Sequence, residues 1–461
     1  MTVSNTTADI AITNRASTKA ADPTAINDTG SMHRIVIVGG GAGGLSLACR
    51  LGRKFRRNRS VEVVLVDQRP THLWKPLLHE VATGSLDGNH DAVSYISLAR
   101  KNSFRFMLAA LDNINTTDNI LDLSMTYGEQ PNEKRSRTLR FNQLVIAIGS
   151  LSNDFGIQGV AEHAIFLDGR PQAEYFHQLF VSHLHRINNQ PPHSDMVLSV
   201  VIVGGGATGV ELAADLHSVA SQLEEFGFPT FSQDKLRVSV LEASDRLLAQ
   251  LPARISASVN EELAALGVNV CTGAMVTEIT DTEVITADGD RFPTDLSVWA
   301  AGIRAPEVLT TSGLAVDGLG RVKTNQQLTL PDCSHVFVIG DCCHCPMENT
   351  DKVVPPRAQS AHQMAALTYR NVINQYRQKP LQTFTYRDYG SLVSLSQYST
   401  VGNLMGNLMR GSLFIEGWIA RLVYRLLYRR HQSAVHGVFA TALIILGDII
   451  HRRTHSHLKL H

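Results

Sequence analysis

Two stretches of the chain repeat the same order of apolar, glycine-rich and helix-like positions. In each, a short unbroken apolar run, residues 35–38 or 200–203, leads directly into a glycine-rich turn and then into a helix-like segment. An apolar run of this length, bounded by glycines, predicts a strand buried in a parallel sheet. Both turns have the spacing G-x-G-x-x-G, formed by Gly39, Gly41 and Gly44 and again by Gly204, Gly206 and Gly209.

Strand, glycine turn and helix in this order predict a dinucleotide-binding unit. The first glycine permits the turn, the second lets the backbone approach a pyrophosphate, and the third lets the helix pack on the strand. The amide groups at the helix start then hold the phosphates. Either motif alone could be a structural turn. Two copies favour a chain that holds a resident flavin dinucleotide and admits a nicotinamide dinucleotide.

An acidic residue ends the strand that follows each turn. Asp67 lies 28 residues past Gly39, roughly the ~20 residues expected for a ribose-binding carboxylate, whereas Glu242 lies 38 residues past Gly204, which is longer than usual. Residues 224–229 have the composition of an insertion and account for the longer second spacing. A carboxylate here accepts hydrogen bonds from a ribose 2′-hydroxyl and repels a 2′-phosphate. Glu242 therefore favours NADH, and the nearby Arg246 keeps NADPH as the less favoured alternative.

Other apolar runs end in small or acidic residues. The run 141–150 ends around Gly149, the run 298–302 ends at Ala301 and Gly302, and the run 336–341 ends at Asp341. Small residues at a strand end suit a close approach of the backbone to a nucleotide. Asp341 is placed to bind a flavin ribityl hydroxyl, or it simply ends its strand.

Composition narrows the class of protein. Lys plus Arg and Asp plus Glu both number 42, so the net charge is zero, which argues against a nucleic-acid-binding protein. Six cysteines in a chain of 461 residues suggest a reducing compartment.

Residues 1–32 are polar, lack the apolar core of a secretory signal, and are interpreted as a disordered tail. No apolar stretch reaches the ~20 residues of a spanning helix.

The cluster Cys342-Cys343-His344-Cys345 has the spacing of half a zinc site or of a redox pair. The sequence contains no second C-x-x-C to complete a tetrahedral site. We therefore predict structural cysteines and no metal.

The order of the two glycine motifs, the run from Trp299 to Gly302 and the strand that ends in Asp341 resemble the two-dinucleotide-binding flavoprotein family. The segments 73–82, 205–212 and 355–363 narrow the resemblance to the bacterial type II NADH dehydrogenases, single-subunit NADH:quinone oxidoreductases that do not pump protons. The resemblance runs from about His33 to the C-terminus. The helix after the first glycine motif contains only Cys49, so the cysteine pair of disulfide reductases is missing there.

The resemblance implies a set of site residues. Those expected to hold FAD are Gly39, Gly41, Ala42, Gly43, Gly44, Asp67, Lys75, Gly149, Asp341 and Ala358. Those expected to hold NADH are Gly204, Gly206, Gly209, Glu242, Ala301 and Gly302, with Glu211 near the nicotinamide. Gln359, His362 and Gln363 would line the quinone site. His362 is a candidate proton route, with helix packing an equal alternative, and from residue pattern alone Lys75 could equally be surface packing.

The C-terminal region has a different character. Between residues 418 and 430 the apolar positions form one helical face, and Arg421, Arg425 and Arg429 lie together on another. This pattern predicts an interfacial helix on an anionic membrane surface, or alternatively a helix that packs on its own domain or a dimer partner. The uncharged run 433–447 is too short to span a bilayer at ~1.5 Å per residue.

The sequence thus predicts an α/β protein with two Rossmann-type dinucleotide-binding domains and a C-terminal membrane-binding α region. The expected domains are the tail 1–32, an FAD domain in two parts, 33–190 and 316–395, an NAD(H) domain, 191–315, and a membrane-anchoring region, 396–461; residues 104–140 are expected to form an antiparallel insertion. We expect a homodimer on the cytoplasmic face of the bacterial inner membrane that transfers electrons from NADH through FAD to a membrane quinone. The alternatives are a soluble NADH-dependent reductase of a protein or disulfide and a non-catalytic NADH sensor.

Overall fold

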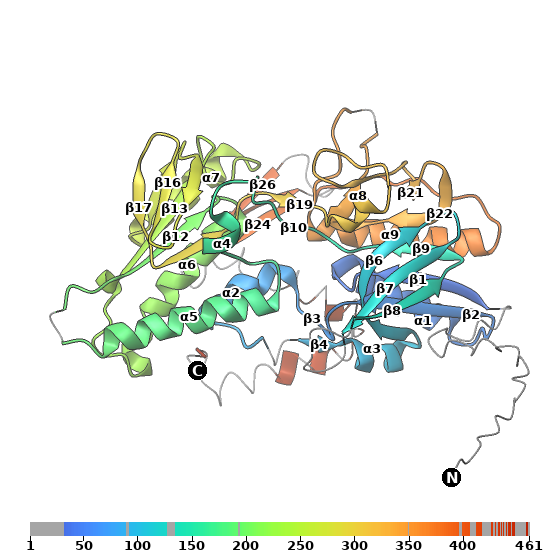
Figure 1. The fold of residues 1–461 in the computed structure, drawn as a ribbon, viewed down its shortest axis with the longest axis horizontal. Helices are drawn as coiled ribbons and strands as arrows, with labels where there is room; N and C mark the ends of the chain where they lie inside the picture. Colours follow the sequence, from blue (N-terminus) through green and yellow to red (C-terminus); the bar gives the residue numbers. More distant parts are fainter. Residues whose placement is uncertain are drawn as a thin grey trace, which may run out of the picture.

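The computed structural model describes residues 32–88, 92–126, 134–191, 194–348, 350–395, 399–405 and 412–416, with separate positions between 426 and 447 and with Leu458 and Lys459. These residues form two lobes that lie side by side (Figure 1). Each lobe is built on its own parallel sheet.

The first lobe contains the first glycine motif. Its sheet has the strand order β21 (Thr329–Leu330), β22 (Cys333–Val338), β9 (Gln143–Ile146), β1 (His33–Val38), β2 (Val61–Asp67) and β5 (Arg105–Leu108). All neighbours pair in parallel except β21 and β22. Helices α1 (Ala42–Phe55), α3 (Tyr95–Asn102) and α9 (Ala358–Tyr376) belong to this lobe. The apolar strands are fully buried, as a parallel sheet covered on both faces requires.

The predicted antiparallel insertion is present but begins later. An antiparallel sheet is formed by β6 (Ala110–Asn115), β7 (Ile120–Thr126) and β8 (Lys134–Arg140). Strand β5, expected to belong to it, instead pairs in parallel with β2 at the edge of the main sheet. The polar and apolar alternation of an edge strand is the same in either setting, so the pattern could not separate them.

The second lobe contains the second glycine motif. Its sheet has the order β11 (Ala164–Phe166), β18 (Leu296–Trp299), β12 (Leu198–Val203), β13 (Leu236–Glu242) and β14 (Asn269–Thr272). Helices α5 (Arg170–Asn188), α6 (Ala207–Ala220) and α7 (Ala253–Ala265) surround it, and β15 (Val276–Ile279), β16 (Glu283–Thr286) and β17 (Arg291–Pro293) form an antiparallel sheet beside it. The predicted insertion at 224–229 overlaps the short helix η2 (Leu223–Phe226), and Phe228 is buried in the core of this lobe.

The predicted boundary at residue 190 does not coincide with the packing. Strand β11 is part of the second sheet, and Phe176, Phe180 and Leu184 of α5 are buried in the second lobe's core. Helix α2 (Leu78–Thr83) also packs against α5 and α6. The sequence of α5 shows which face is apolar but does not show which sheet that face covers.

The region after residue 390 forms a further antiparallel sheet that packs against the second lobe. It consists of β24 (Gly390–Leu395), β25 (Ser399–Met405) and β26 (Ser412–Glu416), and it lies against α6 and α7. The predicted boundary between 395 and 396 therefore divides a continuous antiparallel sheet. The predicted interfacial helix at 418–430 lies outside the described residues except for Leu426 and Arg429.

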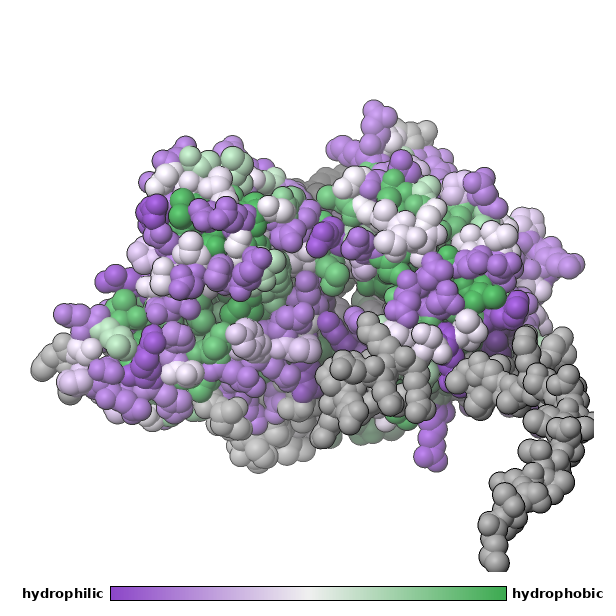
Figure 2. Space-filling model, in the orientation of Figure 1, coloured by the Kyte–Doolittle hydropathy of each residue, from purple (hydrophilic) through white to green (hydrophobic). Residues whose placement is uncertain are grey.

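Short elements complete the connections. The two-stranded ladders pair β3 (Thr71–His72) with β4 (Val93–Ser94), β10 (Leu151–Ser152) with β19 (Ile303–Arg304), and β20 (Val322–Lys323) with β23 (Cys343–His344). The remaining helices are α4 (Val160–His163), α8 (Val308–Thr311), η1 (Lys75–Leu77), η3 (Gln233–Lys235) and η4 (Gly340–Cys342). On the face shown in Figure 2, hydrophobic residues form patches among hydrophilic ones on both lobes. None of the described helices is long and apolar enough to cross a bilayer.

Candidate active site

The first glycine motif forms the turn between β1 and α1. Gly39 has a φ of +100°, and a Cβ on it would meet the backbone of Ala147. A Cβ on Gly44 would collide with the carbonyl oxygen of Gly39, so strand and helix pack through glycine alone. By contrast, a Cβ on Gly41 would meet nothing within 4 Å. No side chain of the described residues caps α1, which leaves its first amide groups directed at this open space.

Asp67 fixes the shape of this turn. Its Oδ2 accepts a hydrogen bond from the amide of Gly40 at 2.6 Å and its Oδ1 one from the amide of Arg69 at 2.8 Å. Burial raises the pKa of Asp67, although both backbone amides oppose the shift. Tyr95 donates from its hydroxyl to the carbonyl of Gly40 at 2.8 Å. The predicted ribose-binding acid therefore lies at the glycine turn, as a dinucleotide site requires.

Asp341 and Lys75 meet at the carboxyl ends of β9 and β22. The Ser150 hydroxyl donates to Asp341 Oδ2 at 3.2 Å, and Lys75 Nζ donates to the Ser150 carbonyl at 3.0 Å. Burial raises the pKa of Asp341, and the charge of Lys75 opposes this rise. Gly149, with φ of +73°, has open space where a Cβ would stand. These residues come from separate segments, and the fold brings them to one edge, where a flavin chain can be held by a carboxylate, an ammonium group and bare backbone.

The second glycine motif repeats the first. A Cβ on Gly209 would collide with the Gly204 carbonyl, whereas one on Gly206 would meet nothing within 4 Å. Glu242 accepts from the Gly205 amide at 2.7 Å and from the Ser244 amide at 2.8 Å. Beside it lies a pocket of about 570 Å³ that includes Gly204, Glu242 and Ala301 in its lining. Gly302, with φ of +65°, follows β18 at the same sheet edge.

Arg246 is bound to the backbone of its own loop. Its guanidinium donates to the carbonyls of Leu251 at 2.9 Å and Ala249 at 2.7 Å. These bonds close the loop after β13 on itself. The acid at 242 thus remains the charged group next to the predicted ribose position.

Glu211 belongs to a buried cluster between helices α2 and α6. Glu211, Asp215 and His79 are each at most 6% exposed. Glu211 Oε1 accepts from the Ser394 amide at 3.0 Å, and its Oε2 lies 3.7 Å from His79 Nδ1. His79 Nε2 lies 3.6 Å from Asp215 Oδ2. Burial raises the pKa of Glu211 far above its usual value and lowers the pKa of His79 to about 4, which favours the uncharged form of both.

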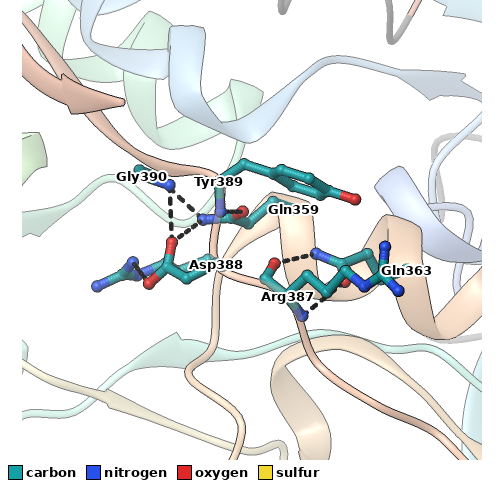
Figure 3. Close-up of polar contacts among 7 residues, drawn as sticks. Gln359, Gln363, Arg387, Asp388, Tyr389 and Gly390 are labelled. Atoms are coloured by element: carbon teal, nitrogen blue, oxygen red, sulfur yellow. Dashed lines mark hydrogen bonds and ion pairs between the residues drawn. The ribbon is translucent and has the colours of Figure 1, made fainter. Parts of the chain in front are cut away.

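The predicted quinone residues lie at the start of α9 (Figure 3). Gln359 donates to Asp388 Oδ1 at 3.1 Å and to the Gly390 carbonyl at 2.9 Å, and it accepts from the Tyr389 amide at 3.0 Å. Gln363 exchanges two hydrogen bonds with the backbone of Arg387, at 2.8 and 3.0 Å. Both glutamines therefore fix the segment 387–390. His362 lies between them in sequence and is partly buried.

The start of α9 also touches the first glycine motif. A Cβ on Gly43 would lie 3.1 Å from the Ala361 carbonyl, and no side chain of the described residues caps the helix at Arg357. The positive end of α9, at Ala358, is thus held close to the predicted flavin site. A helix start in this position favours negative charge in front of it.

The cysteine cluster is buried. Cys342, Cys343 and Cys345 are at most 2% exposed, and burial raises the pKa of the Cys342 thiol to about 12 and of the Cys345 thiol to about 11. Cys49 on α1 is equally buried, with its thiol pKa raised to about 12. A thiol that stays protonated is a poor nucleophile and metal ligand. Within the described ranges, no group of three or more His, Cys, Asp or Glu could hold a metal ion.

Comparison with known proteins agrees with this geometry. Residues 33–365 match the family model "Pyridine nucleotide-disulphide oxidoreductase". The chain is 41% identical to the type II NADH:quinone oxidoreductase of Haemophilus influenzae, over 93% of this chain and 100% of the relative. The chain belongs to the type II NADH:quinone oxidoreductases. It is also 28% identical to the demethylphylloquinone reductase NdbB of Synechocystis, over 88% of this chain and 95% of that protein.

Solved structures agree on the fold of this family. The NDH2 of Plasmodium falciparum in complex with NADH superimposes with a TM-score of 0.77 at 19% identity, covering 93% of this chain and 100% of that one. The sulfide:quinone oxidoreductase of Aquifex aeolicus superimposes with a TM-score of 0.69 at 18% identity, covering 88% of this chain and 92% of that one. The predicted fold class, two Rossmann-type units in an α/β chain, is confirmed.

Several residues of the site escaped the sequence analysis. His79, Asp215 and Ser394 surround Glu211, and Asp388 and Tyr389 bind Gln359. The pair Glu211 and Asp215, four residues apart on a predicted helix, was a usable signal because two acids on one apolar face need partners. Nothing in the sequence of 387–394 indicated that it joins two sites.

Proposed function

We propose that FAD binds at the first glycine motif, in the lobe that contains β1, and that NADH binds at the second glycine motif, in the lobe that contains β12. The chain is an FAD-dependent NADH:quinone oxidoreductase. The observation that best supports a connection between these two sites is one continuous segment. Residues 387–390 are held by Gln359 and Gln363 of α9, and four residues later Ser394 holds Glu211 of α6. One strand thus connects the proposed quinone side to the proposed nicotinamide side.

When bound, FAD accepts a hydride from NADH and delivers two electrons to a quinone. Gly39, Gly41 and Gly44 bring the backbone to the pyrophosphate, together with Ala42 and Gly43 at the start of α1. Asp67 binds the adenosine ribose of FAD. Asp341, Lys75 and Gly149 hold the ribityl chain between the pyrophosphate and the flavin ring. The uncapped start of α9 at Ala358 favours the negative charge that reduction brings to its vicinity.

Glu211 is the proton-holding group next to the nicotinamide in this proposal. Since Oε1 accepts from Ser394 N, the proton of the neutral acid belongs on Oε2, which faces His79. Burial favours the neutral acid at Glu211 and the neutral imidazole at His79, and the charge of the neighbouring Asp215 adds to the rise in the Glu211 pKa. NADH delivers one hydride, and reduction of the quinone to the quinol takes up one further proton. A buried acid at this position can supply that proton.

Gln359 and Gln363 position the quinone by shaping the segment 387–390 rather than by pointing free amides at it. Their side-chain amides are engaged with that segment in the described structure. His362, partly buried on α9, stays a candidate proton route, with helix packing as the alternative.

The C-terminal region supports a peripheral membrane position in this proposal. Phe439, Leu443 and Leu446 are 80%, 56% and 56% exposed, and their spacing places them on one helical face. Apolar side chains exposed along one face suit the boundary between lipid headgroups and acyl chains. The anionic lipid surface, the cytoplasmic face of the inner membrane and the homodimer remain predictions.

The test is NADH oxidation by the purified FAD-loaded protein, with and without a short-chain quinone, repeated with NADPH. We expect rapid quinone-dependent oxidation of NADH and little activity with NADPH, because Glu242 repels a 2′-phosphate and Arg246 is engaged elsewhere. Glu242→Gln should raise the activity with NADPH and so reduce the preference for NADH over NADPH by about tenfold. Flavin bleaching without turnover would contradict the assigned acceptor, and equal use of both nucleotides would contradict the role of Glu242.

A further inference from the structure

In both glycine motifs a buried glycine precedes an exposed one. Gly40 and Gly205 are buried, whereas Gly41 and Gly206, which follow them, are exposed. A Cβ on Gly40 would collide with the Tyr95 hydroxyl, so the first turn rests directly on that side chain. A buried peptide group has to find its hydrogen-bond partners inside the protein.

Gly40 is bound through both of its polar backbone groups. Its amide donates to Asp67 Oδ2 at 2.6 Å, and its carbonyl accepts from the Tyr95 hydroxyl at 2.8 Å. The carbonyl of Gly40 and the amide of Gly41 belong to one planar trans peptide, in which the two groups point in opposite directions. Tyr95 is only 3% exposed, so it directs the carbonyl into the protein. The Gly41 amide therefore points outward, in front of α1.

In the second motif a backbone amide takes the place of the tyrosine hydroxyl. Glu242 accepts from the Gly205 amide at 2.7 Å, and the Leu248 amide donates to the Gly205 carbonyl at 2.9 Å. The geometry of the peptide group then turns the Gly206 amide outward, in front of α6. The two turns thus share one arrangement and use different donors beneath it.

Leu248 donates from a strained backbone that Arg246 supports. The φ of Leu248 is +51°, a left-handed conformation that a bulky residue rarely adopts. Its carbonyl accepts from the Leu251 amide at 2.7 Å, and the Arg246 guanidinium donates to the carbonyls of Leu251 at 2.9 Å and Ala249 at 2.7 Å. Strain of this kind persists where the surrounding structure specifies it. Arg246 therefore fixes the loop that presents the Leu248 amide to the glycine turn.

We propose that Tyr95 and Arg246 are positioning residues for the two dinucleotides. Tyr95 turns the Gly41 amide toward the pyrophosphate of FAD, and Arg246, acting through Leu248, turns the Gly206 amide toward the pyrophosphate of NADH. These roles rest on the proposed placement of FAD and NADH. Neither side chain touches a ligand or takes part in hydride transfer. An amide that already points at the phosphate before binding needs no reorientation, so each residue contributes to affinity.

Tyr95→Phe tests the first turn, because it keeps the ring, whose centroid lies 5.1 Å from that of Phe106, and removes only the hydroxyl. We expect FAD to leave the loaded protein roughly tenfold faster, followed by flavin fluorescence after dilution, while the KM for NADH stays within about twofold. The matched control is Tyr376→Phe, which removes a hydroxyl that accepts from the Asn58 side chain at 3.1 Å, beyond the far end of α1. Equal rates of FAD release in the two variants would overturn the role of Tyr95.

Arg246→Lys tests the second turn and separates geometry from charge, because an ammonium group keeps the positive charge but lacks the planar fork that binds two carbonyls. We expect Arg246→Lys and Arg246→Met alike to raise the KM for NADH and the inhibition constant of ADP-ribose roughly tenfold. The kcat at saturating NADH and the rate of FAD release should stay within about twofold. The control is Arg237→Lys, at an exposed position near the amino end of β13, and it should change none of these values. A KM raised only by Arg246→Met would overturn the loop-fixing role and leave charge attraction in its place.

The same two variants distinguish a failure of these roles from a failure of the proposed function. If Tyr95→Phe raised the KM for NADH and Arg246→Lys accelerated FAD release, the arrangement of the turns would stand, and the assignment of FAD and NADH to the two lobes would be wrong. If both variants left FAD release and the KM for NADH unchanged, the proposed role of both residues would be excluded.

Discussion

Burial controls the charge of the side chains around Glu211. In water a glutamate, an aspartate and a histidine this close would carry charges near pH 7, but desolvation disfavours every charged form. For His79 the result is a pKa of about 4, and for Glu211 a pKa far above its usual value. Glu211, which is charged in the unfolded chain near pH 7, is therefore favoured in its neutral form in the folded one, and His79 stays neutral to a lower pH. Folding and pH are coupled through this cluster.

The coupling gives a prediction for acid stability. His79 has a lower pKa folded, about 4, than unfolded, about 6.5, so the unfolded chain binds the proton first as pH falls. The His79 contribution to stability, present above pH 6.5, is lost between 6.5 and 4, by up to about 3 kcal/mol. Glu211, whose pKa is raised in the folded chain, contributes in the opposite direction as pH falls. His79→Gln should flatten this loss, measured by thermal unfolding of the FAD-loaded protein from pH 7 to pH 5. Parallel curves for the two proteins would exclude His79 as the source.

The two kinds of glycine in the motif predict opposite defects. Gly44→Ala places a methyl group against the Gly39 carbonyl and should destabilise the whole first lobe. Gly41→Ala has open space and an ordinary φ of −65°, so thermal stability without FAD should not change. Its methyl group occupies the surface that a pyrophosphate approaches, so FAD affinity should fall at least about tenfold. Fluorescence titration of the FAD-free protein measures this, and unchanged affinity would mean that the pyrophosphate lies elsewhere.

At the scale of elements, β24 determines how the two substrate sites are related. It begins at the residues that Gln359 holds and it includes Ser394, which donates to Glu211. Helices and strands that carry their own motif were predictable: β1 with α1, β12 with α6, and the strand that ends at Asp67. The strand predicted to end at Asp341 is also present as β22, but it ends at Val338, and Asp341 lies in η4. Strand β24 has no motif, and its place is set by long-range contacts with α6, so its sequence alone could not reveal it. Likewise β5 and α5 were assigned to the wrong neighbours because periodicity reports a buried face and not the partner that buries it.

The link through β24 predicts a selective defect. Gln359→Leu removes three hydrogen bonds from segment 388–390 and should raise the KM for quinone about tenfold or more. The rate of flavin reduction by NADH, followed by stopped-flow absorbance, should stay within twofold. The matched control is Gln375→Leu on the same helix, whose amide binds Ser334 and Gln143 away from the site. A Gln375 variant with the same quinone defect would show that only the stability of α9 matters.

At the scale of the whole molecule, Leu458 and Lys459 contact the folded body of the protein. Lys459 forms an ion pair with Asp87 at 3.4 Å and its amide donates to the Gly84 carbonyl at 2.9 Å, while Leu458 is buried in the core of the second lobe. The segment that carries Phe439, Leu443 and Leu446 is therefore connected at both ends to the folded body. Removing the whole C-terminus would also remove this contact with the loop after α2, so point variants test membrane binding more cleanly than truncation does.

Replacing Phe439, Leu443 and Leu446 together by Ser should reduce co-sedimentation with anionic liposomes at least about tenfold, because three apolar side chains no longer enter the lipid. Activity with a soluble short-chain quinone should remain normal. The control is Ile96→Ser, which removes an apolar side chain 66% exposed on α3 of the first lobe. Equal liposome binding by the triple variant would place the membrane contact on another surface.

The strand order of the first sheet has a consequence for synthesis on the ribosome. Strand β9 pairs on one side with β1, which is made early, and on the other with β22, which is made only after all five strands of the second lobe's parallel sheet. While the second lobe emerges and folds, β9 presents an open edge to the cytosol, a surface prone to pairing with other chains. Asp341 follows β22, so the nascent chain cannot complete its flavin cradle before that time. Cofactor binding therefore comes late in the synthesis of the chain, after the residues of β22 that cover the open edge of β9 have been made.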